Sequence, residues 1–242
     1  MTENRKTTEK KLSVSWSGGK DSSYMLWSLI SQAKFDIVEL HTVIDANTQR
    51  VGMHGVHKDL IVEQANSIGL PVTFIYLESS NSNNKYEEVI KQYYTDIKKR
   101  NIDCVAFGDI FLEDLKLYRD ILLSEFNLKA IYPLWKMDTT ALAKSFIKEK
   151  FKSIICASDA DKFPFVVAGR PFTANFLNKI PDCVDPCGEN GEFHSFVFNG
   201  PIFNHPIKIK KTGVVEKSYE FKNSENVIQK SFFHFCNLKL IT

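Results

Sequence analysis

The sequence lacks any long apolar run, and this absence excludes one class of protein at once. No stretch of the 242 residues approaches the roughly 18 consecutive apolar residues that a membrane-spanning helix requires. The N-terminal segment MTENRKTTEKK has no apolar run either, so we predict a disordered tail over residues 1–11 rather than a signal peptide. We therefore expect a protein with no membrane partner.

The chain also has few cysteines and almost no net charge. The five cysteines form no secreted disulfide framework, and their odd number indicates a reducing cytoplasm as the location. The 31 basic residues nearly balance the 29 acidic ones, for a formal charge of +2. This balance gives no electrostatic signature of nucleic-acid binding, so a nucleic-acid partner is not expected unless the fold builds a local basic patch.

Apolar residues make up 43% of the chain, which is enough for a real core. Up to about residue 156, short apolar runs alternate with segments of helical period. Repeated strand–helix units of this length predict an α/β fold with a parallel sheet and helices on both faces. Strands are predicted at residues 12–16, 36–44, 72–77, 103–107 and 153–156, and helices at 22–32, 57–68, 86–100, 113–126 and 139–149.

The character of the chain changes after residue 159, where proline, glycine and small residues become frequent. We predict an ATP-binding domain over residues 12–160 and a smaller C-terminal α+β subdomain, which binds the substrate, over 161–242. In the latter, residues 207–210, 214–221 and 231–240 have the alternation of strands. Phe232, Phe233 and Phe235 either pack a small sheet or form the contact of a homodimer.

The segment SGGKDSS, residues 17–23, lies where the first predicted strand turns into the first predicted helix. Gly18 and Gly19 allow positive φ and a close approach of backbone N–H groups to a ligand. The positive end of the following helix and the Lys20 ammonium favour an anion there, whereas the alternative is an ordinary capped turn. The hydroxyl groups that add hydrogen-bond donors belong to Ser17, Ser22 and Ser23.

The segment is not a Walker A loop, because Val14 stands where that motif needs a glycine. It resembles the pyrophosphate-binding PP-loop of the N-type ATP pyrophosphatases, also called adenine nucleotide alpha hydrolases, which have a Rossmann-like, HUP-type fold. The resemblance implies that residues 17–23 hold the β- and γ-phosphates of ATP while a nucleophile attacks the α-phosphorus. Asp21 is acidic within an anion site, so a role with Mg²⁺ or a structural role suits it best.

A second group of charged residues stands in DCVDPCGENGEFHS, residues 182–195. Loops that carry acids, glycines and aromatics are typical places for a site. Glu189 and Glu192 are three residues apart and can face one ligand as general base and cation binder. His194 titrates near neutral pH, so it either shuttles a proton from ammonium or forms a hydrogen bond at a strand edge.

With this loop the chain resembles the diphthine–ammonia ligase (diphthamide synthase) family over nearly its whole length. The resemblance rests on SGGKDS, GMHGV, AFGDIFLED, YPLW and DPCGENGEFHSFVFNGPIF. It implies that ATP activates a carboxylate as an acyl-adenylate and that ammonia then displaces AMP. The family's Gly-Glu-x-Gly-Glu motif helps form the pocket for the activated substrate, and its residues here are Gly188, Glu189, Gly191 and Glu192.

One stretch departs from the archaeal and eukaryotic ligases, which usually have tyrosine, glutamate and threonine after the second glutamate. This chain has Phe193, His194 and Ser195 there, and the variant resembles the bacterial branch of the family. The resemblance thus implies the ligase chemistry with ATP, Mg²⁺ and ammonia. It leaves open whether the acceptor is a small-molecule or a protein-borne carboxylate.

Three further residues are candidates because they lie on the ligand side of the sheet: Asp109 and His54 follow predicted strands, and Arg119 lies on a predicted helix near that edge. Asp109 either binds nucleotide, Mg²⁺ or substrate, or caps a helix. His54 either binds substrate or has a structural role. Arg119 either binds a carboxylate or AMP, or forms an exposed salt bridge.

Two cysteines keep other functions open. Cys183 and Cys187 are spaced C-x3-C, and some PP-loop enzymes that thiolate tRNA use paired cysteines. The same pair favours zinc only weakly, since structural zinc sites usually use two pairs. A module that binds adenine nucleotide without turnover is the third alternative.

Overall fold

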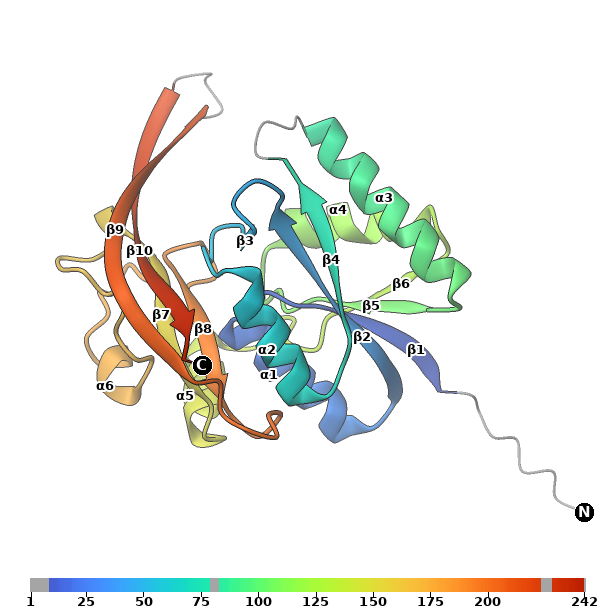
Figure 1. Cartoon of the computed structure of the whole chain (residues 1–242), viewed down its shortest axis with the longest axis horizontal. Coiled ribbons are helices and arrows are strands. Elements are labelled where there is room, and N and C mark those ends of the chain that lie inside the picture. Colours follow the sequence, from blue (N-terminus) through green and yellow to red (C-terminus); the bar gives the residue numbers. More distant parts are fainter. Residues whose placement is uncertain (1–8, 79–82, 223–227, 242) are drawn as a thin grey trace, which may run out of the picture.

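The computed structural model describes residues 9–78, 83–222 and 228–241, which form two sheets side by side (Figure 1). Most of the tail predicted at residues 1–11 lies outside the described residues, and the first strand, β1, already begins at Lys10. The first sheet is parallel except for a two-residue strand, and its order is β4-β2-β1-β5-β6 with β3 antiparallel to the end of β2. Its strands are β1 (Lys10–Ser15), β2 (Phe35–Asp45), β3 (Arg50–Val51), β4 (Val72–Leu77), β5 (Cys104–Ala106) and β6 (Lys129–Ile131).

Helices cover both faces of this sheet, as predicted. The alternation of β1 directs Leu12 and Val14 to one face, where they belong to the same core cluster as residues of α1 and α2. On the other face, residues of α3 and α4 pack with Val105 and Ile75. The helices are α1 (Lys20–Gln32), α2 (Lys58–Ile68), α3 (Asn83–Lys99) and α4 (Glu113–Ser124).

The second sheet is antiparallel in the order β8-β7-β10-β9. Its strands are β7 (Lys152–Asp159), β8 (Phe193–Asn199), β9 (Ile209–Lys222) and β10 (Ile228–Leu240). The other helices of this half of the chain are α5 (Thr139–Lys148), the short 3₁₀ helix η1 (Ala160–Lys162) and α6 (Ala174–Leu177). The prediction that residues 153–156 end the parallel series is wrong, because this strand pairs with β8 and β10 instead. The predicted strands at 207–210 and 214–221 are one strand, β9, with an irregularity in pairing at Gly213.

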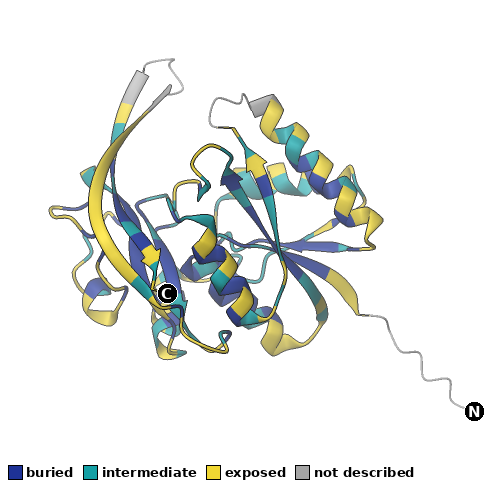
Figure 2. Ribbon diagram, in the orientation of Figure 1, coloured by how far each residue is buried: buried dark blue, intermediate teal, exposed yellow. Residues whose placement is uncertain are grey.

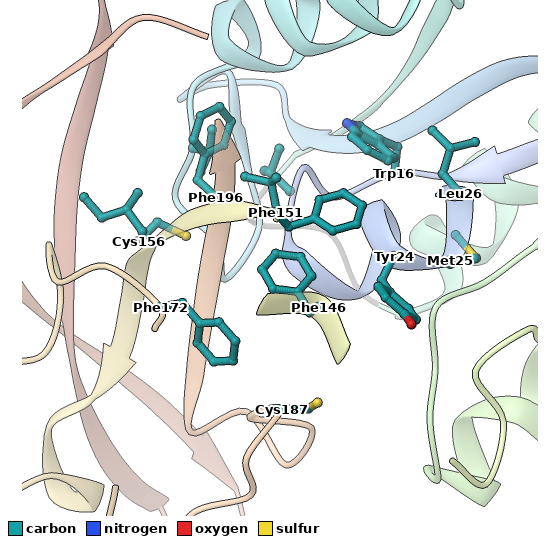
Figure 3. Packing of buried hydrophobic residues seen from close by; sticks show 14 of the residues in the cluster. Trp16, Tyr24, Met25, Leu26, Phe146, Phe151, Cys156, Phe172, Cys187 and Phe196 are labelled. Atoms are coloured by element: carbon teal, nitrogen blue, oxygen red, sulfur yellow. The ribbon is translucent and has the colours of Figure 1, made fainter. Parts of the chain in front are cut away.

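One hydrophobic core joins the two sheets. Phe146 and Phe151 stack with ring centroids 4.8 Å apart, and Tyr24 of α1 lies 6.1 Å from Phe151. Figure 3 shows these rings between α1 and Phe196 of β8. A shared core does not divide the chain into two domains, so the domain boundary predicted at residue 160 stays a prediction. The chain passes from the first sheet to the second earlier, between β6 and β7.

The outer strand β9 is exposed along most of its length, as Figure 2 shows. The aromatic residues predicted to pack a sheet or a dimer contact divide between two environments. Phe233 and Phe235 are buried against each other and against Tyr219, whereas Phe232 is exposed. A homodimer stays a prediction. Among the described residues, none of the helices combines the length and the apolar character that crossing a membrane would demand.

Candidate active site

A cavity of about 310 Å³ lies where the carboxyl ends of β1 and β5 meet the start of β8. Parallel sheets bind ligands at this edge, so its position agrees with the fold. The two sequence segments that we singled out both contribute to it. Its walls are formed by Ser15, Ser17, Lys20, Asp21, Ser22, His54, Gly108, Asp109, Arg119, Gly188, Glu189, Gly191, Phe193, His194 and Ser195.

The two glycines of the phosphate loop (residues 17–23) allow it to pack against its neighbours. Gly18 has φ +76°, and a Cβ atom there would lie 2.6 Å from Oε1 of Gln64. A Cβ atom on Gly19 would lie 2.7 Å from Cε1 of His54. Neither glycine can be replaced without displacing a neighbour, so both shape the loop although neither lines the cavity.

The three serines of the phosphate loop have different environments. Ser17 Oγ accepts a hydrogen bond from the N–H of Gly19 at 3.2 Å, and Ser22 Oγ donates to the carbonyl of Gly19 at 3.0 Å. Both hydroxyls line the cavity. Ser23 is fully buried outside the lining, and its hydroxyl has no partner among the described residues.

Lys20 is buried, and its ammonium is held on several sides. Nζ donates to both carboxylate oxygens of Asp21, at 2.9 and 2.8 Å, and to the carbonyl of Cys187. It also lies 5.3 Å from the ring centroid of Phe193. Burial acts to lower the pKa of Lys20, but Asp21, Cys187 and Glu189 together outweigh it and the pKa is raised. The ammonium therefore stays charged and pairs with Asp21 in the free chain.

Glu189 presents a carboxyl group to the cavity. Its Oε1 accepts a hydrogen bond from the N–H of Ile110 at 2.7 Å. Burial raises the pKa of Glu189 to about 7, and the carboxylates of Asp21 and Asp109 also act in that direction. Glu189 can therefore take up or release a proton at neutral pH, as a general acid or base requires.

Asp109 and Arg119 form an ion pair at the edge of the cavity. The guanidinium of Arg119 also stacks on Phe107, 4.2 Å from its ring centroid. Burial raises the pKa of Asp109, although Arg119 opposes this effect. The pair thus fixes the orientation of Arg119, and a helix cap is not the role that the geometry gives to Asp109.

Two histidines, one from the turn after β3 and one from β8, meet in the cavity. The rings of His54 and His194 lie 4.7 Å apart, and Nδ1 of His54 lies 3.1 Å from the carbonyl oxygen of Ser195. Burial lowers the pKa of His54 to about 4. Burial, followed by the charges of His54 and Lys20, lowers the pKa of His194 well below 6.5. His194 therefore does not titrate near neutral pH as the sequence suggested, and both rings are neutral there.

Glu192 points into its own loop. It is 3% exposed, and its carboxylate accepts hydrogen bonds from the N–H of Asp185 at 3.0 Å and from two N–H groups of Asn190 at 3.0 and 3.1 Å. Gly188 and Gly191 have φ +67° and +87°, which curls the loop around this carboxylate. The structure thus brings Glu189 to the cavity and leaves Glu192 outside its lining.

Two contributors to the site were given no role by the sequence: Gln64 stands in no motif, and Ser195 ends the 182–195 segment without an assigned function. Gln64 of α2 donates to the carbonyls of Gly18 at 3.0 Å and Val197 at 2.6 Å, and it accepts from the indole N–H of Trp16 at 3.0 Å. Ser195 Oγ accepts from the first N–H of α1 at 3.0 Å. Both link the phosphate loop to β8, and only the tertiary packing reveals them.

A second cavity, of about 240 Å³, adjoins the first and shares Ser15, Ser17 and Arg119 with it. It opens between the sheet and the helices α3 and α4. Its walls are mostly aliphatic and aromatic, which suits a flat organic group better than a phosphate. The remaining walls are Trp16, His41, Val43, Val51, Ile75, Tyr86, Ile90, Tyr93, Tyr94, Phe107, Leu115, Tyr118 and Leu122.

The cysteine pair has little of the character that sulfur chemistry needs. Cys187 is buried, its thiol donates to the carbonyl of Thr139 at 3.3 Å, and burial raises its pKa. A raised pKa disfavours the reactive thiolate. Cys183 is exposed. Within residues 9–78, 83–222 and 228–241, no three or more histidine, cysteine or acidic side chains are grouped as a metal site would require.

Comparisons with known proteins agree with the motifs. The model of the diphthamide synthase N-terminal domain matches residues 10–130, and that of the C-terminal domain matches residues 138–232. A diphthine–ammonia ligase from Danio rerio is 25% identical over 225 residues, which cover 82% of this chain and 86% of that protein. One from Mus musculus is 25% identical over 228 residues, with 84% of each chain covered.

Solved structures resemble the chain only distantly. The U34-tRNA thiolase NcsA from Methanococcus maripaludis, with its [4Fe-4S] cluster, has a TM-score of 0.36 and 16% identity, and the match covers 58% of this chain and 57% of that one. A predicted subunit of a tRNA methyltransferase from Methanocaldococcus jannaschii has a TM-score of 0.37 and 18% identity, covering 64% and 81%.

Proposed function

The chain belongs to the diphthamide synthase family, and we propose that it is an ATP-dependent ligase that adenylates a carboxylate and converts it to an amide with ammonia or an amine. One observation carries the proposal: the phosphate loop and Glu189 face the same cavity although they come from opposite ends of the chain. The assignment of the Phe193-His194-Ser195 variant to the bacterial branch stays a prediction.

We place ATP across the two adjoining cavities in one orientation. The β- and γ-phosphates would lie on the phosphate loop, where Lys20, two serine hydroxyls and the N-terminus of α1 converge. The nucleoside would lie in the second, largely apolar cavity. Arg119 lines both cavities, so its guanidinium lies where the α-phosphate would bridge them.

Asp21 is the residue that best suits a magnesium ion beside the phosphates. Its carboxylate lines the cavity and is 30% exposed, and carboxylate oxygens are the ligands that Mg²⁺ prefers. When bound there, the ion would supply positive charge to the leaving pyrophosphate. Lys20, which now pairs with Asp21, would then contact a phosphate oxygen.

The chemistry takes place in two steps. An oxygen of the acceptor carboxylate bonds to the α-phosphorus, and the bond from that phosphorus to pyrophosphate breaks. The nitrogen of ammonia then bonds to the acyl carbon, the carbon–oxygen bond to AMP breaks, and protons leave the nitrogen. We assign their uptake to Glu189, whose pKa is about 7, and we assign to the neutral imidazole of His194, with His54 beside it, the role of accepting a hydrogen bond from the attacking nitrogen. Gly188, Gly191 and Glu192 position the loop that carries Glu189.

Hydroxylamine in place of ammonia provides a direct test, because an activated carboxylate is trapped as a hydroxamate, which gives a coloured complex with ferric iron. The chain is incubated with ATP, Mg²⁺, hydroxylamine and a panel of carboxylates, and the nucleotide products are separated. We expect AMP and pyrophosphate together with a hydroxamate from one class of acceptor. ADP and phosphate as the products would contradict attack at the α-phosphorus.

Matched variants separate this proposal from the two alternatives. Glu189→Gln should abolish hydroxamate formation, whereas replacing Cys183 and Cys187 together by serine should leave it intact. Loss of the activity in the double cysteine variant would favour sulfur transfer. Calorimetric binding of ATP without any AMP across the whole panel would instead favour a nucleotide-binding module.

A further inference from the structure

A buried polar network borders the second cavity between β1, β2 and α3. Its centre is the Ser13 hydroxyl, which lies 3.1 Å from Oε1 of Glu39, 2.8 Å from Nδ1 of His41 and 2.7 Å from the hydroxyl of Tyr93. Glu39 is 2% exposed and is also bound by two nitrogens of Arg100 at 2.6 and 3.0 Å. Burial acts to raise the pKa of Glu39, but Arg100 and the other donors lower it, so the group is a carboxylate.

The carboxylate determines which nitrogen of His41 carries the proton. A carboxylate only accepts hydrogen bonds, so Tyr93 donates its proton to Oε1 of Glu39 at 2.7 Å. The 2.7 Å contact between the Ser13 and Tyr93 hydroxyls then needs the Ser13 proton, which Ser13 gives to the Tyr93 oxygen and to Glu39 rather than to His41. The serine oxygen then has only lone pairs left for His41, and Nδ1 must donate to it. His41 lies within the core with its pKa lowered to about 4 by burial, so the ring is neutral. Nε2 is therefore an unprotonated acceptor.

His41 lines the second cavity, and Nε2 makes no hydrogen bond with any residue in the described part of the chain. The ring is fixed on its other side by Tyr93, whose centroid is 4.8 Å away. Val43 and Ile75 are among the apolar walls around it. A ligand that fills this cavity is thus offered one hydrogen-bond acceptor, and it satisfies that acceptor only with an N–H or O–H donor.

We propose that His41 selects the purine base of the nucleotide by accepting a hydrogen bond from an exocyclic 6-amino group. This inference rests on the proposed function, which puts the nucleoside in the second cavity. A 6-oxo purine would instead direct an oxygen lone pair at Nε2, and the buried contact would be repulsive. The selection is made by the Glu39–Ser13–His41 chain of hydrogen bonds, because it fixes the tautomer.

Calorimetric titration of the whole chain with ATP, with ITP and with inorganic triphosphate tests the inference. All three carry the phosphates, and the first two differ at the 6-position of the base and in the proton that ITP carries on the neighbouring N1. The wild-type chain should bind ATP at least about tenfold more tightly than ITP. His41→Leu should lose this preference while its affinity for triphosphate, which needs only the phosphate loop, stays unchanged.

Two variants of the network keep the test independent of a simple loss of packing. Glu39→Gln lets Ser13 donate to His41 instead, so Nε2 becomes a donor and the preference should shift toward ITP. Tyr93→Phe keeps the carboxylate and the order of protons, so it should retain the preference for ATP. Urea unfolding of each variant verifies that it is folded.

Equal affinity of the wild-type chain for ATP and ITP would overturn the inference, as would a preference that survives in His41→Leu. Binding of triphosphate without any binding of ATP would also overturn it, because the base would then have no place in the second cavity. Failure of both ATP and triphosphate to bind would instead contradict the proposed function itself, and the inference with it.

Discussion

Replacing Glu189 by glutamine is expected to stabilise the chain above neutral pH and to have little effect on stability near pH 4.5, the ordinary pKa of a glutamate. Glutamine keeps an oxygen that can accept from the N–H of Ile110, but it cannot ionise. In the wild-type chain the folded state holds the pKa of Glu189 at about 7. Between these two values the folded chain binds more protons than the unfolded chain, so its stability falls as the pH rises.

The size of the effect follows from the same two values. The difference between 4.5 and about 7 corresponds to about 3 kcal/mol in the free energy of unfolding. Because Glu189 is partly exposed, solvent screening reduces this figure to about 1–2 kcal/mol. The glutamine variant should therefore exceed the wild-type chain in stability by that amount above pH 7, and the gain should vanish toward pH 4.5.

Urea unfolding of both chains at closely spaced pH values across this window measures the difference. Glu192→Gln is the matched control, because its carboxylate accepts three hydrogen bonds inside the loop and does not line the cavity. That variant should be less stable than the wild-type chain by about 1–3 kcal/mol. A difference between Glu189→Gln and the wild-type chain that stays constant with pH would refute the reasoning.

Three further predictions follow from the geometry of the site. Gly18→Ala should lower the free energy of unfolding by about 1–3 kcal/mol and abolish triphosphate binding, because the new Cβ would collide with Gln64. Gly52→Ala is the control, since a Cβ there would have no atom within 4 Å, and it should change neither quantity. Urea unfolding measures the first effect and calorimetry the second. Gln64→Leu should cost about 2–4 kcal/mol in the free energy of unfolding, since two carbonyls and an indole N–H lose their partner. Cys187→Ser should leave the rate at which the folded chain reacts with a disulfide reagent unchanged, because the buried Cys187 thiol contributes little to that rate. A slower reaction of the variant would mean that Cys187 is accessible.

The parallel sheet and the phosphate loop were predictable because their signals are local. Alternation in β1 and the two glycines after it specify a strand, a turn and a helix within about twenty residues, with Lys20 starting α1. The position of the site at the carboxyl edge then follows from the topology of parallel sheets. No long-range information was needed for these steps.

The second sheet was harder to predict, because its strands pair with partners that are distant in the sequence. Residues 153–156 have the composition of a buried strand, and this composition does not state which sheet they join. β7 pairs with β8 and with β10, whose residues follow it by many positions. The strands β3 and β6, of two and three residues, are too short for a periodic signal.

The roles of the two acids in the GENGEFH segment show the same limit for the site. Glu189 and Glu192 are equivalent candidates as long as only their spacing is known. Left-handed backbone at Gly188 and Gly191 turns one carboxylate into the loop and the other toward the cavity. The low pKa of His194 is equally hidden in the sequence, because it comes from burial and from the nearness of His54 and Lys20, which are distant along the chain.

The site lies where the two sheets pack together, so both sheets must fold for it to form. The first N–H of α1 donates to Ser195, and the N–H of Val197 donates to the carbonyl of Gly18 at 2.9 Å, so β8 supports the phosphate loop directly. A chain that ended at residue 160 would keep the phosphate loop but lose these two partners and Glu189. The proposed phosphate binding and the position of Glu189 therefore both depend on one shared core, and a perturbation at the junction of the sheets should affect both.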